Sequence, residues 1–267
     1  MTAKSRSVTL ERIAFATTES EPHALETIVA LAAGNATVVS CVFIEDLDLL
    51  RAAQLPFALE VCRATNVVRR TSSSEVERGL KDRAAAAKKL VVHTAEQAGA
   101  KWSFEVIRQR PASAVLELAK RTDITVFSAT GSLRYGDRAG HQPRTGNQRQ
   151  SSLDASIVVL IDRSAASARA VQVAHKLAAV RRLPVCGVVV AATKAGVDRL
   201  VGQLSRRREP DIAHITGLAR PDFSDIVMTV PAHHPAAVVL PISQIEDSSD
   251  RIHELEEAIG NPILIVT

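Results

Sequence analysis

The chain has 267 residues, of which 46% are hydrophobic and 3% aromatic, and its net charge is +4. This length suits one large domain or two of ordinary size, and the hydrophobic fraction is too high for a disordered chain. Because no run approaches the roughly 20 apolar residues that cross a bilayer and residues 1–7 are not followed by an apolar signal core, we expect a cytoplasmic protein with no membrane partner.

The first predicted unit is a strand at 12–16, a polar turn at 17–22 and a helix at 23–33, followed by a second strand at 37–44. The helix carries its apolar residues at helical spacing on one face: Leu25, Ile28, Val29 and Ala32. Aromatic residues are scarce, so the core must consist of Val, Ile, Leu and Ala. That composition is typical of parallel strands buried on both faces.

An insertion occupies residues 46–98. Its first part is apolar and interrupted by Pro56, and a long helix with an alanine-rich centre is predicted over 74–98. Within the insertion, segment 47–59 brings together four apolar residues rimmed by charge: Leu47, Leu50, Ala53 and Leu55. Such a patch indicates a surface for a protein partner, and the alternative is that the segment docks on its own sheet.

The first half ends with a β-rich run at 102–108, a helix opened by Pro111 and a strand at 124–129. Residues 132–153 are rich in Gly, Arg, Gln and Ser and are predicted to be a flexible linker. We therefore expect a first domain at 8–131 with four strands.

The second half repeats the order of the first from 154 to 267. Strands are predicted at 156–161, 185–191, 236–242 and 262–266, with a β-rich run at 211–216. Helices are predicted at 166–180, 197–207, 222–230 and 249–259. Ser20 aligns with Ser164 at an offset of 144 residues, and the pair 31–32 aligns with 177–178 at an offset of 146. This alternation predicts two open, mostly parallel α/β sheets in tandem.

Several runs resemble the universal stress protein family in the same order: ATTESEPHALETIVALAA, LIDRSAASARAVQVAHKLAA, RPASAVLELAKRTDITVFSATG and NPILIVT. The resemblance implies a Rossmann-like fold, a regulatory or stress-associated role and little enzymatic activity. Many members bind ATP or AMP at the carboxyl ends of the strands, and others bind no nucleotide. The family also implies that 262–267 is an edge strand that pairs across a homodimer.

Nucleotide-binding members carry an aspartate in the first loop, where it contacts the ribose or adenine. Asp162 matches this position in the second half, with Ser164 two residues on, whereas Thr18 stands there in the first half. A threonine hydroxyl can form a hydrogen bond but cannot replace a carboxylate.

The family's glycine-rich phosphate loop is also incomplete in both halves. The first half reads Ser128, Ala129, Thr130, Gly131 after its fourth strand, and the second half has Pro241 and no glycine there. Because proline lacks the N–H that a phosphate would need, the better candidate pocket is in the first half. Its predicted lining is Thr17, Thr18, Ser20, Val42, Gly131 and Ser132. Arg134 and Arg138 would contact phosphate if the linker folded over the ligand, and otherwise they are solvated.

The remaining chemistry-bearing residues have structural interpretations. Asp46 is expected to cap a helix, and His233 and His234 are expected in a turn rather than on a metal. The cysteines Cys41, Cys62 and Cys186 lie far apart and are expected to be free thiols. The arginine-rich clusters lack the interleaved aromatics of nucleic-acid binders, so nucleic acid is not expected as a partner.

Three functions remain open from the sequence, and the least favoured is a nucleic-acid-associated protein that uses the linker arginines Arg134, Arg138, Arg144 and Arg149. The first is a non-enzymatic regulatory protein that acts through a protein interaction or a small ligand. The second is an adenine-nucleotide binder or slow ATPase that uses the incomplete first-half site. No nucleophile with a paired base is recognisable, and no metal or catalytic residue is predicted.

Overall fold

The computed structural model describes residues 12–19, 22–32, 37–61, 66–99, 101–128, 155–206 and 212–267. Its first half contains β1 (Arg12–Thr17), α1 (Pro22–Ala32), β2 (Val38–Asp46), α2 (Leu47–Ala53), β3 (Leu59–Val61), β4 (Val68–Arg70), α3 (Ser73–Ala98), β5 (Lys101–Gln109), α4 (Pro111–Ala119) and β6 (Ile124–Ser128). The predicted linker at 132–153 lies outside the described residues.

The second half contains β7 (Ser156–Ile161), α5 (Ala165–Arg181), β8 (Val185–Ala191), α6 (Lys194–Arg206), β9 (Ile212–Ala219), α7 (Phe223–Thr229), the 3-10 turn η1 (Val230–His233), β10 (Pro235–Pro241), the 3-10 turn η2 (Ile242–Gln244), α8 (Asp250–Ile259) and β11 (Ile263–Val266). Within the described residues, no helix has both the length and the apolar character needed to cross a membrane.

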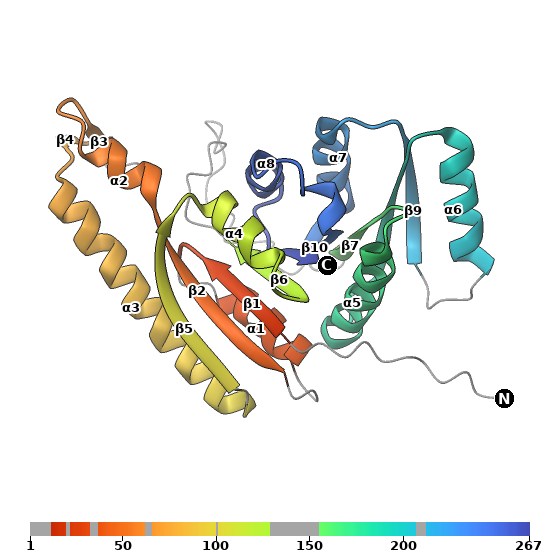
Figure 1. Ribbon diagram of the computed structural model, residues 1–267, viewed down its shortest axis with the longest axis horizontal. Coiled ribbons are helices and arrows are strands. Elements are labelled where there is room, and N and C mark those ends of the chain that lie inside the picture. Colours follow the sequence, from red (N-terminus) through yellow and green to blue (C-terminus); the bar gives the residue numbers. More distant parts are fainter. Residues whose placement is uncertain are drawn as a thin grey trace.

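The two halves share one nine-stranded sheet with the order β5-β2-β1-β6-β11-β10-β7-β8-β9 (Figure 1). Its strands pair in parallel within each half, and β11 pairs antiparallel with β6 where the halves meet. The predicted α/β class with mostly parallel strands is confirmed. The tandem halves are continuous with one another through hydrogen-bonded strands.

The predicted repeat is visible in the strand register. Ile13 of β1 pairs with Val39 of β2, and Ile157 of β7 pairs with Val185 of β8. Ile157 follows Ile13 by 144 residues and Val185 follows Val39 by 146, which are the two offsets that the sequence predicts. Residues 12–44 and 157–190 therefore have the same topology.

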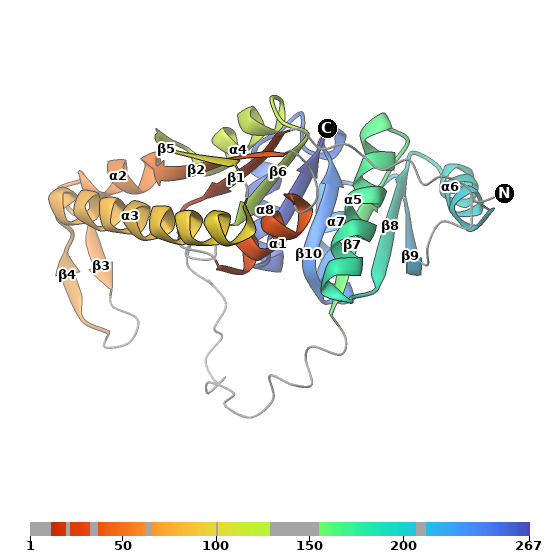
Figure 2. The ribbon, with the colours of Figure 1, turned by 90° about the horizontal axis from the view of Figure 1, so that it is seen from below.

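Helices cover both faces of the sheet (Figure 2). Helices α1, α3, α5 and α6 contribute buried residues to one core, and α4, α7 and α8 contribute them to the other. All residues of β6, β7 and β11 are buried, as expected for strands covered on both sides. Aliphatic side chains and three phenylalanines, Phe15, Phe43 and Phe127, fill the interior.

The two halves also contact each other through helices and the chain terminus. The Lys176 ammonium on α5 donates a hydrogen bond of 2.6 Å to the backbone oxygen of Leu31 at the end of α1. The hydroxyl of Thr267 donates one of 2.8 Å to the backbone oxygen of Thr122 before β6. These contacts hold the second half against the first beside β11.

The expectation that 262–267 forms an edge strand is wrong. Strand β11 lies between β10 and β6 and pairs with both, so neither of its edges is open. A homodimer built on this strand would require β11 to leave one neighbour. The physical reason is that the described part of the first half contributes four strands to this sheet, and the C-terminal strand pairs with the last of them while it also pairs with β10.

Candidate functional site

The carboxyl ends of the strands point to opposite edges of the sheet in the two halves, because β11 and β6 run antiparallel. Asp162 and Ser164 follow β7 at one edge, whereas Thr17 and Thr18 lie at the end of β1 at the other. The predicted site residues that the structure describes therefore lie at two opposite edges of the sheet and cannot bind one ligand together.

In the second half, the Asp162 carboxylate is held by hydrogen bonds from within the protein. Its Oδ1 accepts from the backbone N–H of Ser164 at 2.8 Å and from the Ser164 hydroxyl at 2.6 Å. Its Oδ2 accepts from the Ser243 hydroxyl at 2.6 Å and from the Gln244 side-chain amide at 2.7 Å. Both oxygens are thus occupied, with donors from η2 following β10.

These contacts set the charge of Asp162. Burial raises its pKa, but the hydrogen bonds from Ser164, Ser243 and Gln244 outweigh burial, and the net pKa is lowered. The group is an ionised carboxylate that its neighbours stabilise.

The partners of Asp162 are themselves fixed. The Arg251 guanidinium donates to the backbone oxygen of Gln244 at 2.9 Å, and it lies 5.4 Å from the centre of the Phe223 ring. The Ser164 hydroxyl accepts from the backbone N–H of Ser167 and caps α5. The point between β7 and β10, where an open α/β sheet usually binds ligands, is therefore closed by side chains.

Sequence reasoning placed Asp162 correctly after its strand but missed Ser243 and Gln244 as its partners. They lie more than 80 residues further along the chain. The available signal was their position after β10, where the repeat would place the phosphate loop.

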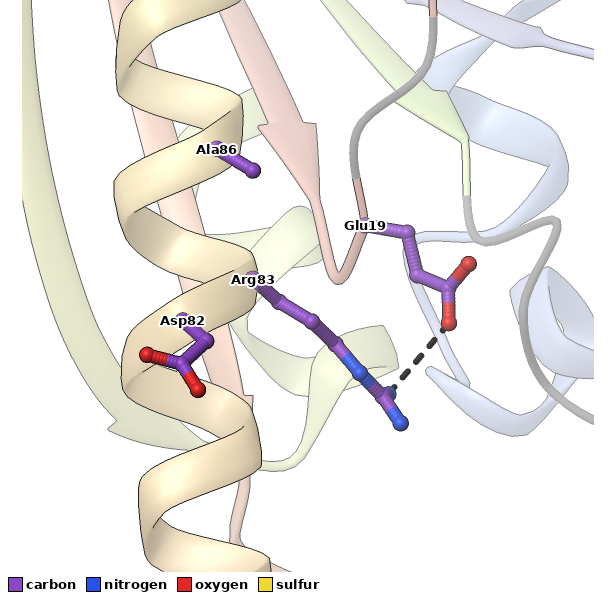
Figure 3. Close-up of a pocket in the computed structure, with 4 residues that line it drawn as sticks. All are labelled: Glu19, Asp82, Arg83 and Ala86. Atoms are coloured by element: carbon purple, nitrogen blue, oxygen red, sulfur yellow. Dashed lines mark hydrogen bonds and ion pairs between the residues drawn. The ribbon is translucent and has the colours of Figure 1, made fainter.

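The first-half strand ends remain more open. Thr17 is 2% exposed, and its hydroxyl donates to the backbone oxygen of Glu19 at 2.6 Å. A cavity of about 340 Å³ lies beside this loop, lined by Glu19, Asp82, Arg83 and Ala86 (Figure 3). In Figure 3 Arg83 extends from α3 towards Glu19, and their side chains are 3.3 Å apart.

The other predicted lining residues have different outcomes. The side chain of Val42 is fully buried in the core, so any contact of this residue with a ligand would have to come from its backbone. Thr18 lies in the loop after β1. Ser20, Gly131 and Ser132 lie outside the described residues.

One unpaired polar atom marks this edge of the first half. The hydroxyl of Ser128, at the end of β6 and in register with Thr17, is buried and has no hydrogen-bond partner among the residues that the structure describes. A buried hydroxyl without a partner costs free energy, and it is a feature that a bound ligand could satisfy.

The carboxylates after β2 are structural. The Asp46 carboxylate accepts from the backbone N–H of Asp48 at 2.9 Å and caps α2, which confirms the predicted role. Glu45 binds the Arg108 guanidinium at 2.9 Å, and Asp48 binds Arg110 at 2.9 Å. The first pair links the end of β2 to β5, and the second links the first turn of α2 to the start of α4.

Two histidine side chains, His214 and His233, lie close together. The rings of His214 and His233 lie 5.4 Å apart, and His233 Nε2 is 3.2 Å from the Thr216 hydroxyl. Burial lowers the pKa of His233, and the nearby His214 and His234 lower it further. In the described part of the chain, no group of three or more His, Cys, Asp or Glu side chains could hold a metal ion.

Two cysteines are buried free thiols, Cys41 and Cys186. Burial raises the pKa of Cys41 to about 12, so this thiol is not a nucleophile at neutral pH.

An exposed apolar surface lies on the insertion. We call it the hairpin surface and define it as Leu55, Phe57, Leu59, Val61, Val67 and Val68. Strands β3 and β4 pair antiparallel beyond the start of α3, away from the main sheet (Figure 1). Phe57 is 74% exposed and Leu59 is 61% exposed.

Segment 47–59, for which the sequence leaves open a partner surface or docking on its own sheet, has a buried part and an exposed part. Leu50 and Ala53 are buried in α2, which packs against α3, whereas Leu55, Phe57 and Leu59 are exposed. The sequence did not predict the hairpin, because strands of three residues with no buried side chain leave no periodic signal.

Comparisons with known proteins identify the fold. No protein-family model matches the chain, and no curated protein matches it in sequence. A universal stress protein from Archaeoglobus fulgidus DSM 4304 is similar in structure, with a TM-score of 0.50 and 10% identity over 96% of each chain.

Two further solved structures are similar over 96% of this chain. One is a candidate universal stress protein from Pseudomonas aeruginosa UCBPP-PA14, with a TM-score of 0.49, 9% identity and 93% of that chain covered. The other is the cytoplasmic domain of a prokaryotic cation chloride cotransporter, with a TM-score of 0.46, 9% identity and 95% covered. The sheet order and the similarity to the Archaeoglobus structure show that this chain has a universal-stress-protein-like fold.

Proposed function

We propose that this chain is a non-enzymatic, stress-associated regulatory protein of the cytoplasm that binds a partner protein through the hairpin surface. The observation that carries the proposal is the exposure of six large apolar side chains on the short hairpin of β3 and β4 and on the residues that lead into its strands. A two-stranded hairpin is at best marginally stable in water by itself, and contiguous exposed apolar residues mark interaction sites.

The charges on the hairpin indicate what kind of partner fits. Leu59, Val61, Val68 and Arg70 lie on one face, because Leu59 pairs with Arg70 and Val61 with Val68 across the strands. On the other face the Arg69 guanidinium is neutralised by Glu60 at 2.8 Å. Among the described residues Arg70 has no acidic partner, so we infer an apolar partner surface that supplies a carboxylate.

A second copy of the chain fits this face less well. The apolar face carries Arg70 and no carboxylate, so two hairpins stacked through it would leave both guanidinium groups without a counter-charge. A different protein with acidic residues beside an apolar groove satisfies both features.

The proposal is tested by placing a photo-crosslinking amino acid at Phe57 in the host, with a matched placement at Met228. Met228 is an equally large apolar residue, 79% exposed, on α7 in the other half of the chain. We expect a crosslinked protein from position 57 alone. The protein identified by mass spectrometry is then purified, and its affinity is measured for the original chain and for variants.

Phe57→Ser and Arg70→Glu should each weaken that affinity at least tenfold, as expected for an apolar anchor and a charge pair. Met228→Ser should leave it unchanged. Crosslinks confined to a second copy of the chain, or an affinity that Arg70→Glu does not change, would contradict the proposal.

A second candidate function is adenine-nucleotide binding in the first half, and the unpaired Ser128 hydroxyl favours it. The cavity beside Glu19 and Arg83 lies at the same edge of the sheet. It carries two carboxylates for one guanidinium, which disfavours a triphosphate and leaves AMP as the better ligand.

Titration calorimetry with AMP and ATP tests this candidate. Binding that Ser128→Ala weakens and Ser243→Ala does not would support it, because Ser243 belongs to the closed site of the other half. Absence of heat at millimolar AMP would exclude it.

A further inference from the structure

A second cavity, of about 330 Å³, lies between α5 and α6 in the half opposite to the hairpin. Its walls come from the first turns of α5, from most of α6 and from the loop after β7. The volume falls at the lower end of the range for small-molecule sites, which is roughly 300–1,000 Å³. The closed network of Asp162, Ser243 and Gln244 lies at the strand end beside it and not across it.

Two guanidinium groups give the cavity a positive rim. Arg163 comes from the loop after β7 and Arg199 from α6, and both are exposed. Neither forms an ion pair with any carboxylate in the described part of the chain. The N-terminus of α5, a helix of 17 residues, adds a favourable field for negative charge.

One acidic residue lines the cavity together with the two arginines. Asp162 lines the cavity, but its two oxygens accept four hydrogen bonds from Ser164, Ser243 and Gln244. These neutral donors leave the negative charge of Asp162 in place, but the two guanidinium groups exceed it by one charge and can attract an anion from solution.

The floor and sides of the cavity are apolar. Val171 of α5 and Leu200 and Leu204 of α6 line it, and Ala168 leaves space on the α5 side. An anion that binds here would bury a hydrocarbon part against these residues and would place its charged group at the arginines.

We propose that the cavity between α5 and α6 is a binding site for a small organic anion, a carboxylate or a phosphate monoester with an apolar body. The anionic group lies between Arg163 and Arg199, and the apolar body contacts Val171, Leu200 and Leu204. This site is independent of the partner-binding hairpin and would give the protein a ligand to sense.

Amide chemical shifts of the full-length protein during titration with benzoate, phenyl phosphate and neutral benzyl alcohol test the proposal. We expect saturable shifts, confined to α5, α6 and the loop after β7, with at least one of the two anions and none with the alcohol. The anion that binds more tightly distinguishes a carboxylate ligand from a phosphate monoester.

Two variants separate the site from unspecific attraction. The double variant Arg163→Gln/Arg199→Gln should weaken binding at least tenfold, and Arg78→Gln/Arg121→Gln, which removes the same charge from exposed positions of the first half, should not. Ala168→Leu should block binding by filling the cavity with both arginines in place.

Three results would overturn the proposal. They are equal shifts with benzyl alcohol, equal losses in the two double variants, and shifts spread over the whole surface without saturation.

Discussion

At the scale of single residues, Asp162 is bound by donors from within the protein at a position where the sequence predicts a contact with a ligand. A carboxylate that could face a ligand at the end of β7 instead binds four donors, and Ser243 and Gln244 supply two of them. The sequence predicts the place of Asp162 because the place depends on a local strand-turn-helix pattern. It does not predict the donors, because their approach depends on how β10 pairs with β7.

Replacement of Asp162 should destabilise the protein in a pH-dependent way. We expect Asp162→Asn to lower the free energy of unfolding by about 1–3 kcal/mol at pH 7, since an amide cannot accept all four hydrogen bonds. The folded-state pKa is below the ordinary value of 3.8, so the carboxylate stabilises the fold above that pH and loses this effect as pH falls through the folded pKa.

Urea unfolding at pH 7 and pH 3 measures the effect. The difference between the original chain and Asp162→Asn should shrink at the lower pH. Asp198→Asn, an exposed change on α6, serves as the control. An equal difference in the free energy of unfolding at pH 7 and pH 3 would contradict the stabilising role of the Asp162 carboxylate.

His233 should affect the free energy of unfolding near pH 6.5, which is a higher pH range than the one for Asp162. Its pKa is below the ordinary 6.5, so the unfolded chain binds a proton more readily than the folded chain, and the free energy of unfolding falls as pH decreases below about 6.5. His233→Asn should remove part of this fall. Equilibrium unfolding between pH 7.5 and pH 5.5 checks it, and parallel pH profiles for the two proteins would show that His233 does not contribute.

At the scale of elements, the insertion combines a buried part and an exposed part. Helix α2 was predictable as an apolar segment, and its cap at Asp46 follows from the preference of aspartate for helix starts. The hairpin of β3 and β4 was not predictable from the sequence, because none of its strand residues is buried in a core. Backbone hydrogen bonding continues from the hairpin to its base, where the Thr71 N–H donates to the Ala58 oxygen at 3.1 Å.

The hairpin should therefore be dispensable for folding. Replacing residues 59–70 by two glycines should change the melting temperature by only a few degrees, because the base of the hairpin is already closed. Leu50→Ala, at a position that is 4% exposed, should cost about 2–5 kcal/mol because it leaves a cavity under α2. Thermal unfolding followed by circular dichroism compares the two, and a large loss on removing the hairpin would show that it has a structural role.

At the scale of the whole molecule, one C-terminal strand joins two copies of a βα-layered unit. The repeat could be read from the sequence, since offsets of 144 and 146 residues align Ile13 with Ile157 and Val39 with Val185, which occupy equivalent register positions in the two halves. The position of β11 could not. The family resemblance predicts an edge strand at 262–267, and the apolar run of this strand does not tell that β6 lies on its second side.

The sharing of β11 has a functional consequence. It orients the halves so that their strand ends face opposite edges, and the two incomplete family sites remain apart. It also leaves β5 and β9 as the outer strands of the nine-stranded sheet. In the part of the chain that the structure describes, those edges, the hairpin and the helix faces are open to association with other chains.

The most direct test of this arrangement is an isotope-filtered nuclear Overhauser measurement on an equal mixture of labelled and unlabelled chains. The account predicts contacts between Ile263 and Phe127 and between Ile265 and Thr125 in the uniformly labelled protein, and none of them between chains in the mixture. Inter-chain contacts at these positions, or contacts of β11 with a second β11, would contradict it.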